Sequence, residues 1–334
     1  MIPQRTLGRR GPAVSAVGLG TMGMSEGYYG PSDDDANADT IRHAVELGVS
    51  LIDTADIYGA GGHNEMLVGR ALEGIRDRVV LATKTGLVVS PEGLAVDARP
   101  ERIRRALEDS LRRLRVDHVD LYYLHRIDPA VPVEESVGAM SSLVEAGLAR
   151  HIGLSEVGPA ILRRAHAIHP IAAVQSEYSL WNRDPEARLL PVMRELGVAL
   201  VAFSPLGRGF LAGALPAPDA LGEDDLRRRL PRFQGENLGR NLPIAERAAE
   251  VAGRHGATPA QVALAWVLGR GPDIVPIPGT RRRANVEANV AAAALVLDDD
   301  DRARLDDPAL TPSGERYPPA LMDLLDPEVR APGA

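Results

Sequence analysis

The 334-residue sequence contains no cysteine. It therefore offers no disulfide bond, no thiol nucleophile and no cysteine ligand for zinc or an iron–sulfur cluster. Lysine is almost absent as well, since only Lys84 among the 38 basic residues is lysine and the others are arginine. Lysine differs from arginine in carrying an amine that can form a Schiff base or have its pKa tuned toward neutrality, so the surroundings of Lys84 matter.

Long apolar runs and an excess of positive charge are also missing. No apolar run approaches the ~18 residues of a membrane-spanning helix, and the amino-terminal segment lacks the apolar core of a signal peptide. The net charge of −8 and the scattered arginines argue against a nucleic-acid-binding surface. We therefore expect a cytoplasmic globular protein that binds neither membranes nor nucleic acid, and no oligomeric state is predicted.

Short apolar runs alternate with longer amphipathic segments along the chain. Eight runs are predicted as strands: Ala16–Gly20, Leu51–Asp53, Val79–Thr83, Val119–Leu124, Ile152–Leu154, Ala173–Gln175, Ala199–Phe203 and Ile274–Ile277. Most are continuously apolar, as expected of parallel strands covered on both faces. Helical spacing or helix start and stop signals mark the segments between them: Asp35–Leu47, Asn64–Leu72, Arg99–Leu114, Val133–Ala146, Pro159–His169 and Pro185–Leu196.

This alternation predicts a single-domain (β/α)8 TIM barrel over residues 1–334, with its core at about residues 14–295. The rival, a doubly wound sheet, should have a Gly-x-Gly-x-x-Gly turn that leads directly into a helix. Gly18–Gly23 fits that motif by letter, but the next predicted helix starts near Asp33. A long loop is predicted over residues 207–241, after the seventh strand. An acidic, proline-rich tail follows over residues 298–334, where Asp298–Asp301 should start a helix.

Barrel enzymes place their chemistry at the C-terminal ends of the strands. Here the second strand ends at Asp53, with Tyr58 in the following loop, while the third ends at Lys84 and the fourth at His125. An ammonium lowers the pKa of a nearby tyrosine, a carboxylate orients the ammonium, and a histidine can hydrogen-bond a carbonyl oxygen. Such a set could protonate the alkoxide that forms when hydride attacks a carbonyl, but it needs a cofactor to supply the hydride.

In order and strand placement, these four residues resemble the Asp-Tyr-Lys-His tetrad of the aldo-keto reductases, of the bacterial, plant and yeast type related to potassium-channel β-subunits. Further segments are similar to the same family: Gly18–Met22, Asp53–Ala55, Leu124–Arg126, Gly153–Ser155, Gln175–Leu180, Phe203–Gly207 and Pro278–Thr280. The resemblance extends from about Arg5 to Asn289. It implies that Tyr58 is the general acid, that Lys84 lowers the pKa of Tyr58 while Asp53 orients it, and that His125 positions the carbonyl.

The resemblance also implies that NADPH binds at the mouth of the barrel. Ser155 and Gln175 match the positions that bind the nicotinamide carboxamide, and Phe203 matches the aromatic residue on which the ring stacks. Glu156 stands where relatives usually have asparagine. A carboxylate can accept a hydrogen bond from the carboxamide but cannot donate one.

The remaining implied cofactor contacts lie in three segments: Gly20, Thr21 and Met22; Ser204, Leu206 and Arg208; and Gly279, Thr280, Arg281 and Asn289. The second segment would line the path of the pyrophosphate, and the third would hold the adenosine end. Backbone N–H groups at a helix N-terminus and nearby arginines together bind phosphate well. Arg281 is therefore the leading expected contact of the adenosine 2′-phosphate, with Arg282 and Arg283 as alternatives.

The favoured function is NADPH-dependent reduction of a small aldehyde or ketone, and no metal site is predicted. A Schiff-base aldolase that uses Lys84 as its nucleophile is an alternative, but it leaves Phe203 and Arg281 unexplained. A regulatory protein that senses NADPH through a reductase fold, with slow turnover, is another. The substrate pocket is expected to be lined by residues of the strand-end loops: Met22, Tyr28, Tyr29 and Trp181.

Overall fold

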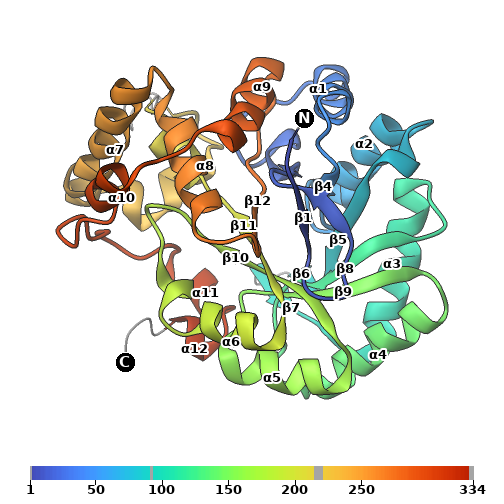
Figure 1. The fold of residues 1–334 in the computed structure, drawn as a ribbon. Coiled ribbons are helices and arrows are strands. Elements are labelled where there is room, and N and C mark those ends of the chain that lie inside the picture. The colour runs from blue at the N-terminus through green and yellow to red at the C-terminus, as the bar shows by residue number, and fades with distance from the viewer. Residues whose placement is uncertain (1, 91–92, 214–220, 331–334) are drawn as a thin grey trace.

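The structure, a computed structural model, describes residues 2–90, 93–213 and 221–330. In this part of the chain eight parallel strands form one sheet, in the order β12-β11-β10-β9-β8-β5-β4-β3 (Figure 1). Their bounds are β3 Leu19–Gly20, β4 Leu51–Asp53, β5 Val80–Thr85, β8 Val119–Leu124, β9 Ala149–Ser155, β10 Ile171–Glu177, β11 Ala199–Phe203 and β12 Ile274–Pro276. All eight predicted strands are therefore present.

The first and last strands meet at a seam built from glycines. The amide of Gly18 donates to the carbonyl of Pro276 at 2.9 Å, which joins the segment before β3 to β12. A Cβ on Gly20 would lie 2.9 Å from the carbonyl oxygen of Ile277, and one on Gly279 would lie 2.9 Å from that of Gly20. Glycine is needed at both positions because the two backbones approach so closely. The seam completes the predicted (β/α)8 barrel.

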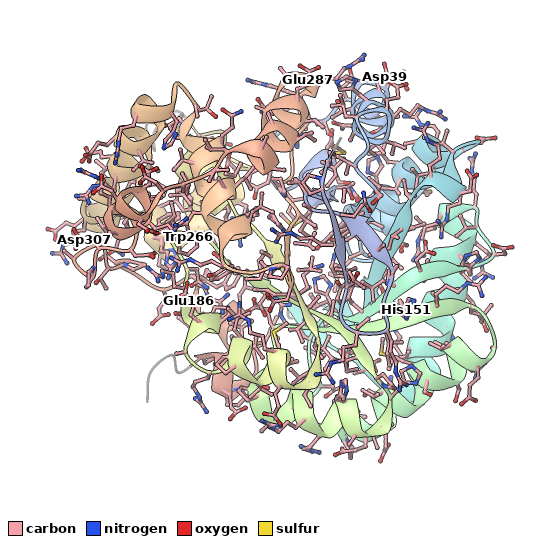
Figure 2. All side chains as sticks on the ribbon, in the orientation of Figure 1. Asp39, His151, Glu186, Trp266, Glu287 and Asp307 are labelled. Atoms are coloured by element: carbon pink, nitrogen blue, oxygen red, sulfur yellow. The ribbon has the colours of Figure 1, made fainter. Side chains whose placement is uncertain are left out.

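Helices surround the sheet on its outer side, as Figure 1 shows. They are α1 Asp34–Glu46, α2 His63–Leu72, α3 Pro100–Leu114, α4 Val133–Glu145, α5 Pro159–Ile168, α6 Leu189–Leu196, α8 Pro259–Gly269 and α9 Arg283–Ala291. A sequence signal explains the start of α1, where the Asp33 carboxylate accepts the amides of Asp35 and Ala36. Figure 2 labels Asp39 on α1 and Glu287 on α9, which flank the seam, and His43 contacts Glu287 at 2.8 Å.

Two hairpins were not predicted. The first, β1 (Gln4–Thr6) and β2 (Ala13–Ser15), directs Leu7 and Val14 into the apolar cluster inside the barrel. The second, β6 (Leu87–Ser90) and β7 (Gly93–Val96), follows β5 on the side of the strand ends. Both strand pairs are short, so their side-chain alternation is a weak signal in the sequence.

The predicted loop over residues 207–241 is too long. Short 3-10 helices lie at Gly207–Ala212, Leu226–Arg229 and Pro231–Phe233, and α7 (Gly235–His255) begins inside the predicted loop. Gly235, Gly239 and Pro243 argued against a helix there. Contacts distant in sequence outweigh them, because the buried Asn241 side chain both accepts from and donates to the backbone of Ser313, at 2.7 and 3.0 Å. Residues 214–220 of the predicted loop lie outside the described residues.

The tail over residues 298–330 returns to the open end of the barrel. It contains α10 (Asp299–Leu305), which starts at the predicted acidic run, and the one-turn helices α11 (Pro319–Met322) and α12 (Pro327–Arg330). Asp326 and Glu328 accept the amides of Gly158 and Ala160 at 3.0 and 2.8 Å, so α12 is bound at the start of α5 (Figure 1). Within the described residues, no helix has the length and apolar character needed to cross a membrane.

Candidate active site

Parallel pairing brings the catalytic candidates together. β4 pairs with β5 with Asp53 opposite Ala82, and the chain after β4 continues along β5. The amide of Thr54 donates to the backbone carbonyl of Ala82 at 2.9 Å, and that of Asp56 donates to the backbone carbonyl of Lys84 at 3.1 Å. The loop that carries Tyr58 is thereby laid over the end of β5.

Lys84 is completely buried, and its ammonium has three partners. It donates to Oδ1 of Asp53 in a short ion pair, to the Thr54 carbonyl at 2.7 Å and to the Tyr58 hydroxyl at 3.2 Å. An ammonium has three N–H groups, so all of them are used. The other Asp53 oxygen accepts from the Gln175 amide at 2.7 Å. Lys84 is therefore held in one orientation by groups from the ends of β4 and β10.

The Tyr58 hydroxyl accepts from Lys84, so its own proton is free to point elsewhere. Burial and the charge of Asp53 raise the pKa of Tyr58 above its ordinary value, although Arg126 and Arg208 oppose them. The lowering of this pKa by Lys84 stays a prediction, because the ammonium charge acts against burial and Asp53. The consequence suits an acid, because a tyrosine with a raised pKa keeps the proton that it must donate.

His125 lies beside Tyr58, with ring centroids 5.8 Å apart and the planes nearly perpendicular. Burial, Arg126 and Lys84 lower the pKa of His125 well below its ordinary value. Its Nδ1 atom is buried and has no hydrogen-bond partner among the described residues. His125 is therefore a neutral imidazole, which can offer one N–H to a carbonyl oxygen.

A cavity of about 620 Å³ opens at the ends of the strands, within the range of small-molecule sites. Most predicted site residues line it: Gly20, Met22, Asp53, Tyr58, His125, Ser155, Gln175, Phe203, Ser204, Leu206, Arg208, Gly279, Thr280 and Arg281. Lys84 lies behind Tyr58, outside this lining. Thr21 and Asn289 do not line the cavity either. Thr21 is buried and its hydroxyl lies 2.8 Å from the Asp53 carbonyl, so it supports the catalytic loop instead.

Glu156 does not face this cavity. Its Oε1 accepts the Glu177 amide at 2.8 Å, and its Oε2 accepts from Arg316 at 2.8 Å. Glu156, Ser204 and Arg208 all have left-handed backbone conformations, with φ of 54°, 48° and 57°. Such strain at non-glycine residues concentrates at functional sites, and here it occurs on the loops after β9 and β11.

The predicted phosphate-binding arginines have different surroundings. Arg281 donates to the carbonyls of Gly23 and Pro31, each at 2.5 Å, and so holds the loop between β3 and α1. Arg283 turns away to His43, at 3.0 Å. Arg282 is exposed and lines the cavity. Of the three, Arg282 is therefore the arginine whose side chain makes no competing bond in the described structure.

Several lining residues were missed in the sequence. They come from the tail, the β6–β7 hairpin and the start of α9: Tyr317, Leu321, Leu324, Leu87, Leu94 and Asn285. Met22, Tyr28 and Tyr29 line the cavity as predicted. Trp181 does not, because it is buried and stacks on Phe210 with centroids 3.9 Å apart. Only 4% of the residues are aromatic, so the presence of Tyr317 was the one sequence signal that the tail contributes to the cavity.

Comparison with known proteins identifies the class to which this fold and site belong. Residues 16–309 match the profile of the Aldo/keto reductase family. A probable aldo-keto reductase 1 from Glycine max is 46% identical over 298 residues, which cover 88% of this chain and 85% of that protein. The chain therefore belongs to the aldo/keto reductase family, whose members are nicotinamide-dependent oxidoreductases.

Solved structures agree with this assignment. A glycerol dehydrogenase from Gluconobacter oxydans superposes with a TM-score of 0.81 at 32% identity, over 91% of this chain and 94% of that chain. An aldo-keto reductase from Klebsiella pneumoniae, solved in complex with NADPH, superposes with a TM-score of 0.73 at 30% identity. That match covers 95% of this chain and 99% of the other. The barrel and its open end are thus shared with enzymes of the family.

Proposed function

We propose that this protein reduces aldehydes or ketones to alcohols with NADPH, and that Tyr58 is the proton donor. One observation carries the proposal: the Tyr58 hydroxyl accepts a hydrogen bond from a buried ammonium and lines the cavity. Its proton is therefore available to a substrate oxygen in that cavity. His125, neutral and adjacent, supplies an N–H that can hold the same oxygen.

The cavity has the groups that a nicotinamide dinucleotide requires. Ser155 and Gln175 offer hydroxyl and amide groups to the carboxamide, and Phe203 offers a ring face. At the other end, Arg282 and the start of α9 offer charge and backbone N–H groups to a phosphate. The NADPH complex of the Klebsiella pneumoniae relative supports NADPH in particular. Bound in its reduced form, this cofactor supplies a hydride to the carbonyl carbon.

The residues of this chain handle the proton. Tyr58 donates it to the carbonyl oxygen and becomes a phenolate, whose charge would be costly in so buried a position. The Lys84 ammonium, 3.2 Å from the Tyr58 oxygen, stabilises the phenolate charge with its own positive charge. Asp53 keeps Lys84 in place. Tyr58 thus donates the proton and Lys84 stabilises the phenolate. Asp53 orients Lys84, and His125 holds the carbonyl oxygen.

The Schiff-base alternative fits the structure poorly. A nucleophilic lysine must reach its substrate with a free lone pair. Lys84 uses all three N–H groups and does not line the cavity, which Tyr58 separates from it. Borohydride should therefore trap no substrate on the protein.

The test is NADPH oxidation against a panel of aldehydes, ketones and sugars, with NADH measured in parallel. We expect many turnovers per enzyme with NADPH, and fewer with NADH. Oxidation that stops after one equivalent of bound cofactor would contradict the proposal and favour an NADPH sensor. Recovery of an imine adduct at Lys84 would favour the aldolase.

A further inference from the structure

A buried charge cluster joins the tail to the barrel beside the cofactor cavity. We call it the tail clamp: Glu156, Glu177, Arg208, Arg316 and Tyr317. Arg316 donates to Glu156 at 2.8 Å and lies 3.5 Å from Glu177. Arg208 lies 3.9 Å from the same Glu177 and donates to the Tyr317 hydroxyl at 3.1 Å. The tail thus supplies two residues to a cluster whose other members lie at the end of β10 and in the loops after β9 and β11.

The charges of the tail clamp balance. The side chains of both glutamates and both arginines are each at most 7% exposed, so none of these charges is solvated by bulk water. Burial would raise the pKa of Glu156, but Arg316 and Arg126 outweigh it and hold this pKa below its ordinary value. Removal of one charge from such a buried set leaves its partner uncompensated. Asp184 and Arg232 lie beside the clamp and offset each other in charge.

Three members of the tail clamp reach the cofactor site, since Arg208 and Tyr317 line the cavity and Glu156 adjoins Ser155. Arg208 lines the cavity, on the predicted path of the pyrophosphate. Glu156 follows Ser155, which is predicted to bind the carboxamide. The left-handed backbone at Glu156 is held by its bonds to Arg316 and Glu177, so the orientation of Ser155 depends on them.

We propose that Arg316 is a positioning residue for the cofactor, which rests on the NADPH-dependent function proposed above. Arg316 pairs with Glu156 and also lies closer to Glu177 than Arg208 does, so it weakens the attraction of Glu177 for Arg208 and leaves more of the Arg208 charge to the cofactor phosphates. Without Arg316, Glu177 has Arg208 as its remaining cation in the clamp and draws it away from the cavity. The site also gains one negative charge, which repels an anionic dinucleotide.

If Arg316 has this role, three variants should differ in their effect on NADPH affinity. Arg316→Met should weaken NADPH binding about tenfold or more, because it leaves a buried carboxylate unpaired beside the site. Glu156→Gln should weaken binding much less than Arg316→Met, because it removes a negative charge from the site and its amide oxygen can still accept the Glu177 amide. In the double variant the charge is balanced again, and the new side-chain amide can donate to the Glu177 carboxylate in place of Arg316.

The experiment measures the dissociation constant of NADPH by calorimetry for the native protein, the two single variants and the double variant. Steady-state kcat and KM are measured for the same proteins. Arg330→Met is the matched control, since Arg330 lies in the same tail and pairs with Asp323 at 3.0 Å, away from the clamp. We expect the double variant to bind NADPH within about threefold of the native protein, and the control to match the native protein. The loss in Arg316→Met should appear in cofactor affinity more than in kcat at saturating NADPH.

Three results would overturn this role. They are unchanged NADPH affinity in Arg316→Met, binding in Glu156→Gln as weak as in Arg316→Met, or a double variant that binds NADPH no better than Arg316→Met, as the loss of a purely structural contact would give. If Arg316→Met does not fold, Arg316→Gln, which loses the charge but can still form a hydrogen bond, and the double variant carry the same test. If the native protein fails to bind NADPH at all, the proposed function is wrong. If it binds but the Arg316 variants bind equally well, only the tail clamp inference is wrong.

Discussion

The two ends of the cavity are built differently. At the catalytic end, Asp53, Lys84 and His125 are at most 7% exposed and come from the ends of consecutive barrel strands. At the phosphate end, Arg282 and Asn285 are exposed and stand at the start of a helix. The catalytic end is a buried polar network, in which hydrogen bonds fix the positions of the Asp53 and Lys84 side chains. The phosphate end presents charge to solvent and does not depend on such a network.

This difference predicts how each end responds to change. A substitution in a buried network disturbs every partner and so affects both activity and stability. A substitution of an exposed arginine removes charge from a ligand but leaves the fold intact. The four variants that follow compare the two ends, from the largest expected effect to the smallest.

Tyr58→Phe should abolish most turnover, by about 10³-fold or more, because it removes the only proposed proton donor. NADPH should still bind, since the change leaves the phosphate end untouched. Steady-state rates and NADPH titration separate the two effects. Tyr122→Phe is the matched control: Tyr122 is equally buried but donates to the Ile103 carbonyl, away from the cavity. Near-normal turnover in Tyr58→Phe would refute the assignment.

Lys84→Arg should reduce kcat by about 10²-fold and lower the free energy of unfolding by about 2–4 kcal/mol. The guanidinium keeps the charge but is larger and flat, so it cannot reproduce three bonds at a completely buried position. Kinetics and denaturant melts check both losses. The reverse exchange at the surface, Arg70→Lys, should change neither quantity, as Arg70 makes an exposed ion pair with Asp35. An Lys84→Arg enzyme with native activity would show that the buried network tolerates substitution.

Asp56→Asn should stabilise the protein, and more at pH 8 than at pH 5. Burial and the charge of Glu65 raise the pKa of Asp56 to about 7. An aspartate whose pKa is raised by folding favours the native state when protonated, so stability falls as pH rises from about 4 to 7. Asparagine cannot ionise, so it removes this loss, on the order of 1–2 kcal/mol at pH 8.

Thermal melts at the two pH values check the Asp56 prediction. Asp39→Asn is the control, because Asp39 is exposed on α1 (Figure 2) and its removal should shift the two melting temperatures equally. An Asp56→Asn protein with the same gain at both pH values would mean that Asp56 does not titrate in this range. Such a result would remove the evidence that charge at this end is costly.

Arg282→Ala should have the smallest effect, at the phosphate end. We expect NADPH affinity to fall about tenfold while NADH affinity and the melting temperature stay nearly unchanged, because an exposed phosphate contact adds affinity without supporting the fold. Arg283→Ala is the control, since Arg283 faces His43. If Arg283→Ala weakens NADPH binding as much as Arg282→Ala, general charge and not one contact holds the phosphate. Equal losses for NADPH and NADH would argue against recognition of the 2′-phosphate.

The sequence predicts the catalytic end better than the rest of the site for a physical reason. Parallel strands end at one face, so Asp53, Lys84 and His125 could be placed together from strand order alone. No such rule links Arg316 to Glu156, which lie 160 residues apart and meet only through the packing of the tail. The partners of Arg281 were equally hidden, because they are backbone carbonyls of a loop.

The helices and strands also differ in how well the sequence predicts them. The eight strands and the six helices between Asp35 and Leu196 have strong apolar periods and clear end signals, and they were predicted within a few residues, whereas α8 was not predicted. The start of α7 was missed because Gly235, Gly239 and Pro243 oppose a helix locally, while Asn241 stabilises it through the tail. The β6–β7 hairpin was missed because neither of its strands has a long alternating pattern.

The burial of Lys84 has a practical consequence for handling the protein. Apart from the terminal amine, the 334 residues carry a single primary amine, and in the folded state it is closed off from solvent. Reagents that acylate lysine should therefore leave the folded barrel unlabelled at every side chain. Once the barrel opens, Lys84 becomes available to them, so its labelling rate records unfolding at the active site. The residue proposed to support catalysis is thus also a built-in reporter of the folded state.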